Sequence, residues 1–346
     1  MENAGATEGT TAPPPLTFGY LYDFRNPEQW HRPWEAIYEE TLDVVAWTES
    51  VGFCGAWVPE HHGADDGYMP TPHLALAAIS ARTKHIRLGA AVAIAPLYHP
   101  VRFAEECAVL DLLSNGRLET AVGIGYRRRE YEMNGEAFGR RGSRFDEFLD
   151  IVCALWTGET VNFTGRHYAL QNARIVPPPP RRKIPLYIGG FVEKAMQRAV
   201  KYADGYFGNE ELWDLYFETA AQAGRDPAGI AIRVPGLFLT VAEDPERAMN
   251  ELSPYYHHVY RCYSNWMNED NALGMDGSMD PMDLDAFKQS GILQILTPDD
   301  AVTYFKALKE RMRIDHFMMM RPPGLPAARF IEYAQLFADR VIPSVR

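Results

Sequence analysis

Eight short apolar runs, most of them followed by a segment with helical periodicity, constrain the fold more than any other feature of this chain. Continuously apolar runs favour buried strands, and strands that alternate with helices predict βαβ units in a parallel sheet. The predicted strands are 17–24, 53–58, 86–95, 118–125, 185–190, 206–209, 230–244 and 315–321. Pro235 lies near the middle of the seventh run and predicts a bend or bulge there.

Segments with helical spacing lie between these runs, at 34–52, 71–83, 99–116, 143–158, 191–205, 212–224 and 297–312. An eightfold alternation closes best as an α/β fold of the (β/α)8 TIM-barrel type, in which the functional site lies at the carboxyl ends of the strands. Two stretches depart from the alternation, about 158–184 and 250–292, and the second shows no clean periodicity. We expect both to be insertions at the barrel rim, within a single domain over 16–346.

Composition limits the classes of function. The chain has 346 residues, ordinary globular proportions and a formal net charge of −12, which argues against nucleic acid as a partner and favours small-molecule ligands. No apolar run reaches the length of a membrane span, so we expect no membrane partner. Residues 1–15 form a polar, proline-ended tail without the features of a signal peptide, and we expect it to be disordered. Four cysteines without a CxxC pair predict reduced thiols and a cytoplasmic location.

A carboxylate and two histidines follow the second predicted strand directly, as Glu60, His61 and His62. The strand-end position places them on the catalytic face and favours an acid/base role. Two other interpretations stay open: histidines that hydrogen-bond backbone groups in a capped loop, and a metal site that includes Asp65 and Asp66. Adjacent side chains of an extended chain diverge, and no further His or Cys stands at metal-like spacing, so the metal interpretation is disfavoured.

The third predicted strand and the end of the fourth carry small residues. Ala90 to Ala93 would let a flat ligand approach the backbone, although ordinary barrel packing also explains small residues there. Gly123 ends the fourth strand and leaves the barrel mouth open.

Two further segments suit an anion. One is a set of arginines, Arg127–Arg129 with Arg140, Arg141 and Arg144, which is either a solvated basic loop or a phosphate clamp. The other is Gly189–Gly190 before a helix, which is either a plain turn or a backbone cradle for phosphate.

Over most of its length, from 17 to 343, the chain resembles the bacterial luciferase-like flavin-dependent monooxygenases. The segments that carry the resemblance are PEHH (59–62), 88–126, SRFDEFL (143–149), 184–207 and the closing TPDDAV with IDHFMMM. The resemblance implies a TIM barrel with one flavin at its carboxyl face. It also implies that His61 lies beside the flavin in acid/base chemistry, with His62 as its neighbour and Glu60 as an orienting carboxylate.

The same resemblance implies the cofactor contacts. A bulge at Ala91–Val92, often with a non-prolyl cis peptide, would support the flavin ring, with Gly123 and Tyr126 at the mouth. Arg144, Gly189 and Gly190 would hold the phosphate. Two positions depart from the family pattern. Phe191 stands where many relatives have a phosphate-binding serine, and Gly123 replaces the reactive cysteine of luciferase, which argues against light emission.

The function implied is that of a monooxygenase. Reduced FMN would come from a separate NAD(P)H-dependent flavin reductase, since no GxGxxG follows a strand. Dioxygen would give a peroxyflavin that oxygenates a small, mostly apolar organic substrate. Aromatic residues, including those of the insertion near Tyr255–Trp266, would line the pocket, and the helix around Glu105–Leu113 would form a homodimer surface. The alternatives are a hydride-transfer oxidoreductase that uses a deazaflavin coenzyme, favoured by Arg127–Arg129, and a non-catalytic flavin-binding barrel, disfavoured by the retained Glu60-His61-His62.

Overall fold

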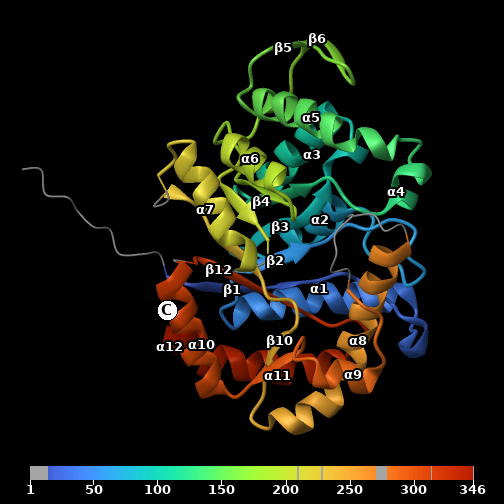
Figure 1. The fold of residues 1–346 in the computed structure, drawn as a ribbon, viewed down its shortest axis with the longest axis vertical. Helices are drawn as coiled ribbons and strands as arrows, with labels where there is room; N and C mark the ends of the chain where they lie inside the picture. The colour runs from blue at the N-terminus through green and yellow to red at the C-terminus, as the bar shows by residue number, and fades with distance from the viewer. Residues whose placement is uncertain (1–14, 209, 227–228, 270–278, 313, 346) are drawn as a thin grey trace, which may run out of the picture.

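The strands of this chain form a closed parallel barrel. Figure 1 shows the computed structural model as a ribbon. The structure describes residues 15–208, 210–226, 229–269, 279–312 and 314–345. The strand order around the barrel is β1-β12-β9-β8-β7-β4-β3-β2, which confirms the predicted fold class. The barrel strands are β1 Thr17–Leu21, β2 Gly55–Val58, β3 Arg87–Ile94, β4 Leu118–Gly123, β7 Leu186–Gly189, β8 Gly205–Phe207, β9 Arg233–Pro235 and β12 His316–Met320. Each lies within or one residue outside a predicted strand.

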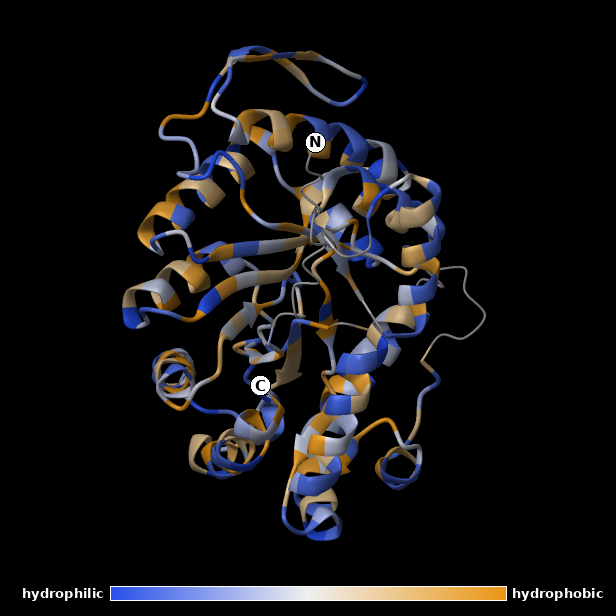
Figure 2. Ribbon diagram, turned by 90° about the vertical axis from the view of Figure 1, so that its left-hand side faces the viewer, coloured by the Kyte–Doolittle hydropathy of each residue, from blue (hydrophilic) through white to orange (hydrophobic). Residues whose placement is uncertain are grey.

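Helices surround the barrel and turn their apolar faces toward it, so that orange and blue alternate along each helix in Figure 2. On α3, for example, Phe103, Cys107 and Leu110 are buried in the core. The α-helices are α1 Trp34–Ser50, α2 Pro72–Arg82, α3 Pro100–Leu113, α4 Arg128–Met133, α5 Arg141–Trp156, α6 Glu193–Tyr202, α7 Trp213–Gln222, α8 Pro245–Glu269, α9 Leu284–Gln289, α10 Pro298–Met312, α11 Ala327–Arg340 and α12 Ile342–Val345. Short 3-10 helices are η1 Glu28–Trp30, η2 Ala95–Leu97, η3 Phe138–Arg140 and η4 Glu210–Leu212.

The predicted strand 230–244 is two strands in the structure. β9 ends at Pro235, and β10 (Leu239–Val241) leaves the barrel to pair in parallel with β11 (Gln294–Leu296). Proline has no N–H to donate to a neighbouring strand, which is why the barrel pairing ends there. The bend opens the barrel mouth between β9 and the elements that follow.

The insertion over 158–184 contains an antiparallel hairpin, β5 (Val161–Thr164) and β6 (Ala169–Ala173), which projects beyond α5 in Figure 1. The insertion over 250–292, whose sequence shows no clean periodicity, contains helices nevertheless: α8 covers Pro245–Glu269 and α9 covers Leu284–Gln289. Buried residues of α8, among them Leu252, Tyr256 and Val259, do stand at helical spacing, but the polar residues interspersed along the same stretch masked that periodicity. Residues 270–278 of that insertion, and 1–14 of the predicted tail, lie outside the described residues.

The amino-terminal end of the barrel interior is polar. Nε1 of Trp57 donates to Nε2 of His316 at 2.9 Å, and Nδ1 of His316 lies 2.9 Å from the Thr17 hydroxyl. Burial, helped by the nearby charges of Arg87 and Arg233, holds the pKa of His316 well below its ordinary value. The ring is therefore neutral, with its one proton on Nδ1.

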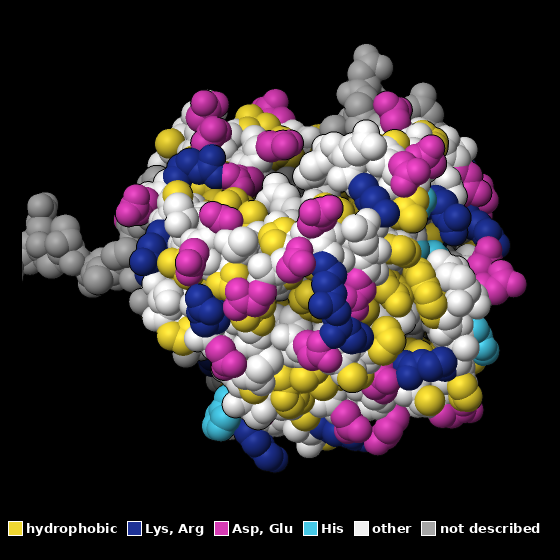
Figure 3. All heavy atoms as spheres, turned by 90° about the horizontal axis from the view of Figure 1, so that it is seen from below, with side chains coloured by type: hydrophobic (Ala, Val, Ile, Leu, Met, Phe, Trp, Pro, Cys, Tyr) yellow, Lys and Arg dark blue, Asp and Glu magenta, His cyan; other side chains and the backbone are white. Residues whose placement is uncertain are grey.

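The surface carries both signs of charge. In Figure 3, Asp and Glu are interspersed with Lys and Arg over the face seen from below, and no continuous basic area covers the described part of that face. The four cysteines, Cys54, Cys107, Cys153 and Cys262, form no disulfide with one another. Among the described helices, none combines the length and apolarity needed to cross a membrane.

Candidate active site

A cavity of about 960 Å³ occupies the carboxyl face of the barrel. Residues at or just after all eight barrel strands line it, as expected for a site in this fold. Its lining is mostly apolar and aromatic, with a few polar groups at its edges. The sequence-predicted positions that line it are Glu60, His61, Ala91, Val92, Gly123, Tyr126, Gly189, Gly190 and Phe191.

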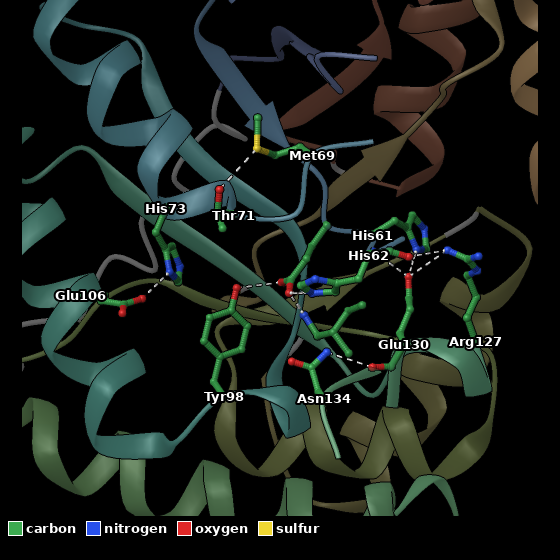
Figure 4. A network of polar contacts seen from close by, with 12 residues as sticks. His61, His62, Met69, Thr71, His73, Tyr98, Glu106, Arg127, Glu130 and Asn134 are labelled. Atoms are coloured by element: carbon green, nitrogen blue, oxygen red, sulfur yellow. Dashed lines mark hydrogen bonds and ion pairs between the residues drawn. The ribbon is translucent and has the colours of Figure 1, made fainter. Parts of the chain in front are cut away.

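His61 is held by a carboxylate from a different part of the chain. Its Nδ1 lies 2.8 Å from Oε1 of Glu130, a fully buried residue of α4. The same oxygen accepts the backbone N–H of His62 at 3.0 Å and a guanidinium N–H of Arg127 at 3.3 Å. Figure 4 shows Glu130 between the His61 ring and Arg127. Burial acts to raise the pKa of Glu130, but these hydrogen bonds and charges outweigh it and lower the pKa.

Glu60 holds the second histidine instead of the first. Its Oε1 lies 2.7 Å from Nε2 of His62, while its Oε2 accepts the Ile94 N–H and the Tyr98 hydroxyl, both at 2.9 Å. Burial acts to lower the pKa of His62, but the Glu60 hydrogen bond and the charges of Glu60 and Glu130 raise it above its ordinary value. Glu60 lines the cavity and His62 does not, so Glu60 links the cavity wall to the His62 ring behind it.

Aromatic rings enclose His61 on the side away from Glu130. Its ring centroid lies 4.7 Å from that of Tyr68, 4.8 Å from Trp266 and 5.6 Å from Tyr126. Trp266 belongs to α8, and its ring also contacts the Arg127 guanidinium, 4.2 Å from the ring centroid, and the rings of Tyr68 and Tyr263. The insertion that carries α8 therefore supplies a wall of the site.

The predicted bulge of the third strand is present, with a non-prolyl cis peptide. The Ala91–Val92 peptide is cis, and the pairing of β3 with β4 shifts register between Ala90 and Ala93. The Val92 side chain points across the next two strands of the barrel: a β-carbon on Gly123 would lie 3.2 Å from its Cγ2, and one on Gly189 would lie 3.1 Å from its Cγ1. The absence of β-carbons at these two positions leaves room for the Val92 side chain over the ends of β4 and β7.

The structure does not bring Arg144 to the cavity. Its guanidinium donates to the Pro96 carbonyl at 2.9 Å and pairs with Glu136 at 2.7 Å. The guanidinium groups that line the cavity belong to Arg141, the first residue of α5, and to Arg198 of α6. Arg198 is paired with Asp146 at 2.6 Å, whereas Nε of Arg141 is buried without a hydrogen-bond partner.

Gly190 lies beside these arginines and joins β7 to α6. Its φ is +152°, and a β-carbon there would lie 2.6 Å from Cβ of Ala195, so this turn admits glycine only. Phe191 follows it on the cavity rim, 38% exposed. This end of the cavity thus offers backbone and guanidinium N–H groups.

A second polar cluster lies behind Tyr68. Ligand-type atoms of Asp66, His258 and Cys262 lie within 4.8 Å of one another, but the Arg25 guanidinium is 2.6 Å from Asp66 and 3.3 Å from His258. A cation is thus already present among these atoms, which argues against a metal ion there. Although burial acts to raise it, the hydrogen bond from His258 and the charge of Arg25 lower the pKa of Asp66 to about 2.

These features define an enzyme active site at the mouth of a TIM barrel. The chain belongs to the luciferase-like monooxygenase family, whose model matches residues 16–302. It is 27% identical over 247 residues to the oxygenase component of a flavin-dependent trigonelline monooxygenase of Acinetobacter baylyi, covering 66% of this chain and 67% of that one. It is 26% identical over 322 residues to an F420-dependent glucose-6-phosphate dehydrogenase of Amycolatopsis mediterranei, covering 89% of this chain and 94% of that one.

Solved structures agree on the fold. The monooxygenase RslO1 of Streptomyces bottropensis superposes with a TM-score of 0.81 at 21% identity, covering 95% of this chain and 99% of that one. Family membership and these relatives establish that the protein is an oxidoreductase. The relatives include both a flavin-dependent monooxygenase and an F420-dependent dehydrogenase, so they differ in cofactor and in reaction.

Glu130 is the site residue that sequence reasoning missed. It follows three arginines, Arg127–Arg129, and the run drew attention only as a basic patch, whereas residues 128–133 form the helix α4. The signal that was available is a carboxylate three positions after Arg127 and shortly after the fourth strand, where a buried acid would face the catalytic mouth.

Proposed function

We propose that this protein is a flavin-dependent monooxygenase that uses reduced FMN and dioxygen to oxygenate a small, mostly apolar organic substrate. The observation that carries the proposal is a single cavity with three parts: the cis segment and small residues at Val92, Gly123 and Gly189, the unsatisfied Nε–H of Arg141, and the His61 ring. A planar ring system with an anionic tail matches the first two parts. The third supplies an acid/base group to the substrate.

The residues present fit FMN. A ring lying on the cis Ala91–Val92 segment would contact Gly123 and Gly189. The phosphate would lie near Arg141, whose orphaned Nε would gain an acceptor, with Gly190 and the α6 N-terminus nearby. When bound, reduced FMN supplies the electrons that activate dioxygen for transfer of one oxygen atom.

The protein's own groups would position the substrate and manage protons. The aromatic rings around His61, namely Tyr68, Tyr126 and Trp266, exclude water from the reacting centre. His61 lines the cavity and holds or releases a proton at Nε2, while Glu130 fixes its orientation through Nδ1.

A deazaflavin coenzyme for hydride transfer is the second candidate, and it is supported by the relative that depends on F420, a coenzyme of that class. Its acidic tail needs basic residues at the mouth. Arg127 does not serve that need, because it is buried against Glu130 and Trp266. The cavity rim also carries Glu211, which would repel such a tail, so we favour FMN.

Two partners follow from the proposal. The trigonelline relative is the oxygenase component of its system, which supports a separate NAD(P)H-dependent flavin reductase for this protein as well.

A homodimer would form through α2 and α3, which pack side by side and expose Leu74 (71%), Val109 (47%), Leu112 (43%) and Leu113 (64%). A monomeric protein rarely leaves such apolar side chains together on its surface. We further propose that 16–346 is one domain, with the two insertions at its rim.

The deciding experiment is a flavin titration. The purified protein would be mixed anaerobically with reduced FMN and, separately, with reduced F420, and each dissociation constant would be measured. The proposal expects tighter binding of reduced FMN, followed on aeration by oxygenation of a substrate. Tight binding of F420 alone would assign the protein to hydride transfer, and binding of neither would overturn both assignments.

A further inference from the structure

The free nitrogen of the His61 ring faces a hydroxyl group. Nε2 lies 3.5 Å from the hydroxyl oxygen of Tyr126, and both residues line the cavity. Hydrogen bonds among catalytic groups are often long without ligand and tighten when the substrate binds. The arrangement is thus a chain of three groups, Glu130, His61 and Tyr126, that runs from a buried carboxylate to the cavity.

The positions of the protons follow from the hydrogen bonds. Oε1 of Glu130 accepts from the backbone N–H of His62 and from Arg127, so the carboxylate is ionised. The Nδ1 atom of His61 must then carry the ring proton and donate it, which leaves a lone pair on Nε2. Burial raises the pKa of Tyr126 well above its ordinary value, so its hydroxyl keeps its proton and donates it to Nε2. The Tyr126 oxygen remains an acceptor toward the cavity.

Three other tyrosine hydroxyls of the cavity are engaged elsewhere. Tyr68 and Tyr263 bond to each other with 2.6 Å between their oxygens, and Tyr260 donates to the carbonyl of Asp280 at 2.6 Å. His62 offers no alternative route, because its Nε2 is bound to Glu60. Among the described hydrogen bonds of the site, Tyr126 is the link between the His61 ring and a ligand.

We propose that Tyr126 is a catalytic residue that passes a proton between an oxygen atom of the substrate and Nε2 of His61. In the forward direction the substrate O–H bond breaks and its proton bonds to the Tyr126 oxygen. The Tyr126 proton moves to Nε2, which leaves a substrate oxyanion and an imidazolium paired with the Glu130 carboxylate. No electrons are exchanged, and the reverse direction returns the proton to an oxyanion product. The inference rests on the proposed function for the oxygenation itself, and it narrows the substrate class to apolar molecules that bear a hydroxyl or carbonyl oxygen.

The test uses the flavin-free protein, so that it is independent of cofactor binding. The variants are Tyr126→Phe and, as matched control, Tyr263→Phe, which removes a cavity hydroxyl that bonds to Tyr68. In ¹⁵N-histidine NMR spectra, His61 should carry its proton on Nδ1, and its Nε2 signal should show an accepted hydrogen bond. Tyr126→Phe should shift that signal downfield to the position of a free lone pair, and Tyr263→Phe should leave it in place. The opposite tautomer, or a signal indifferent to Tyr126→Phe, would overturn the proposal.

Proton transfer itself is followed with 4-nitrophenol, an apolar hydroxyl compound whose anion absorbs in the visible. Bound to the parent protein and to Tyr263→Phe, it should absorb as the anion, and bound to Tyr126→Phe as the neutral phenol. Equal spectra in all three proteins, or no binding to the cavity, would refute the shuttle. A parallel titration with FMN distinguishes the proposed proton transfer from the proposed function. If the protein does not bind FMN but Tyr126 still passes the proton to His61, the proposed function is wrong and the proton transfer through Tyr126 stands.

Discussion

Oε1 of Glu130 lies 2.8 Å from Nδ1 of His61, although 69 positions separate the two residues in the chain. The same oxygen takes a hydrogen bond from Arg127, which is itself buried. One carboxylate therefore orients the His61 imidazole and neutralises a buried guanidinium.

Glu130→Gln should destabilise the protein by about 3–5 kcal/mol, because it leaves the buried Arg127 charge without its partner. Urea unfolding of the variant measures the loss. The matched control is Glu132→Gln, an exposed carboxylate on the same helix, which should change stability by no more than about 0.5 kcal/mol. Equal effects of the two substitutions would show that the ion pair contributes nothing special.

The buried His316 predicts a loss of stability in mild acid. Its pKa is depressed in the folded protein, so below about pH 6.5 the unfolded chain binds a proton that the folded one does not. The free energy of unfolding should therefore fall as the pH drops from 7 toward 5. His316→Gln keeps an acceptor for Trp57 and a donor for Thr17 but does not titrate, so urea midpoints measured from pH 8 to 5 should decline less steeply than in the parent protein.

The two candidate phosphate residues can be separated by substitution. Arg141→Gln should weaken FMN binding by about 10- to 100-fold, the value of a charged hydrogen bond, and leave riboflavin binding unchanged. Arg144→Gln should have the smaller effect, since that guanidinium is engaged by Glu136 and the Pro96 carbonyl. A larger loss for Arg144→Gln would place the phosphate where the family resemblance places it.

Filling the space beside Val92 should exclude the flavin ring. Gly123→Ala adds a β-carbon 3.2 Å from Val92 Cγ2 and should push that side chain into the space of the ring, so FMN affinity should drop. The double variant Gly123→Ala with Val92→Ala should recover most of the loss, as fluorescence titration would show. Unchanged affinity in the single variant would mean that the ring binds elsewhere in the cavity.

The dimer proposal predicts that a charge on the α2–α3 surface disperses the assembly. Leu113→Glu should give a monomer by light scattering, because an ionised carboxylate would otherwise be buried between subunits. An equally exposed apolar residue away from that surface, Val176→Glu on the segment after β6, serves as the control and should leave the mass unchanged. A monomeric parent protein would end the proposal outright.

The sequence by itself determined the barrel and the placement of Glu60 and His61 at its mouth. Strand and helix periodicities are local properties, and a residue that follows a strand of a parallel barrel has little choice of location. The same reasoning, with the family resemblance, located the Ala91–Val92 bulge and the glycines of the neighbouring strands.

Only the tertiary structure decided which partners these residues have. Glu130 reaches His61 because α4 folds back over the end of β4, and Glu60 turns to His62 instead. Arg141 lines the cavity and Arg144 does not, because the Arg144 guanidinium is held by the Pro96 carbonyl and Glu136 instead. Trp266 contacts His61 from α8, and no local pattern indicates that this helix packs against the residues that follow β2. Contacts between distant segments depend on how the helices and strands pack, and a local pattern of residues does not determine that packing.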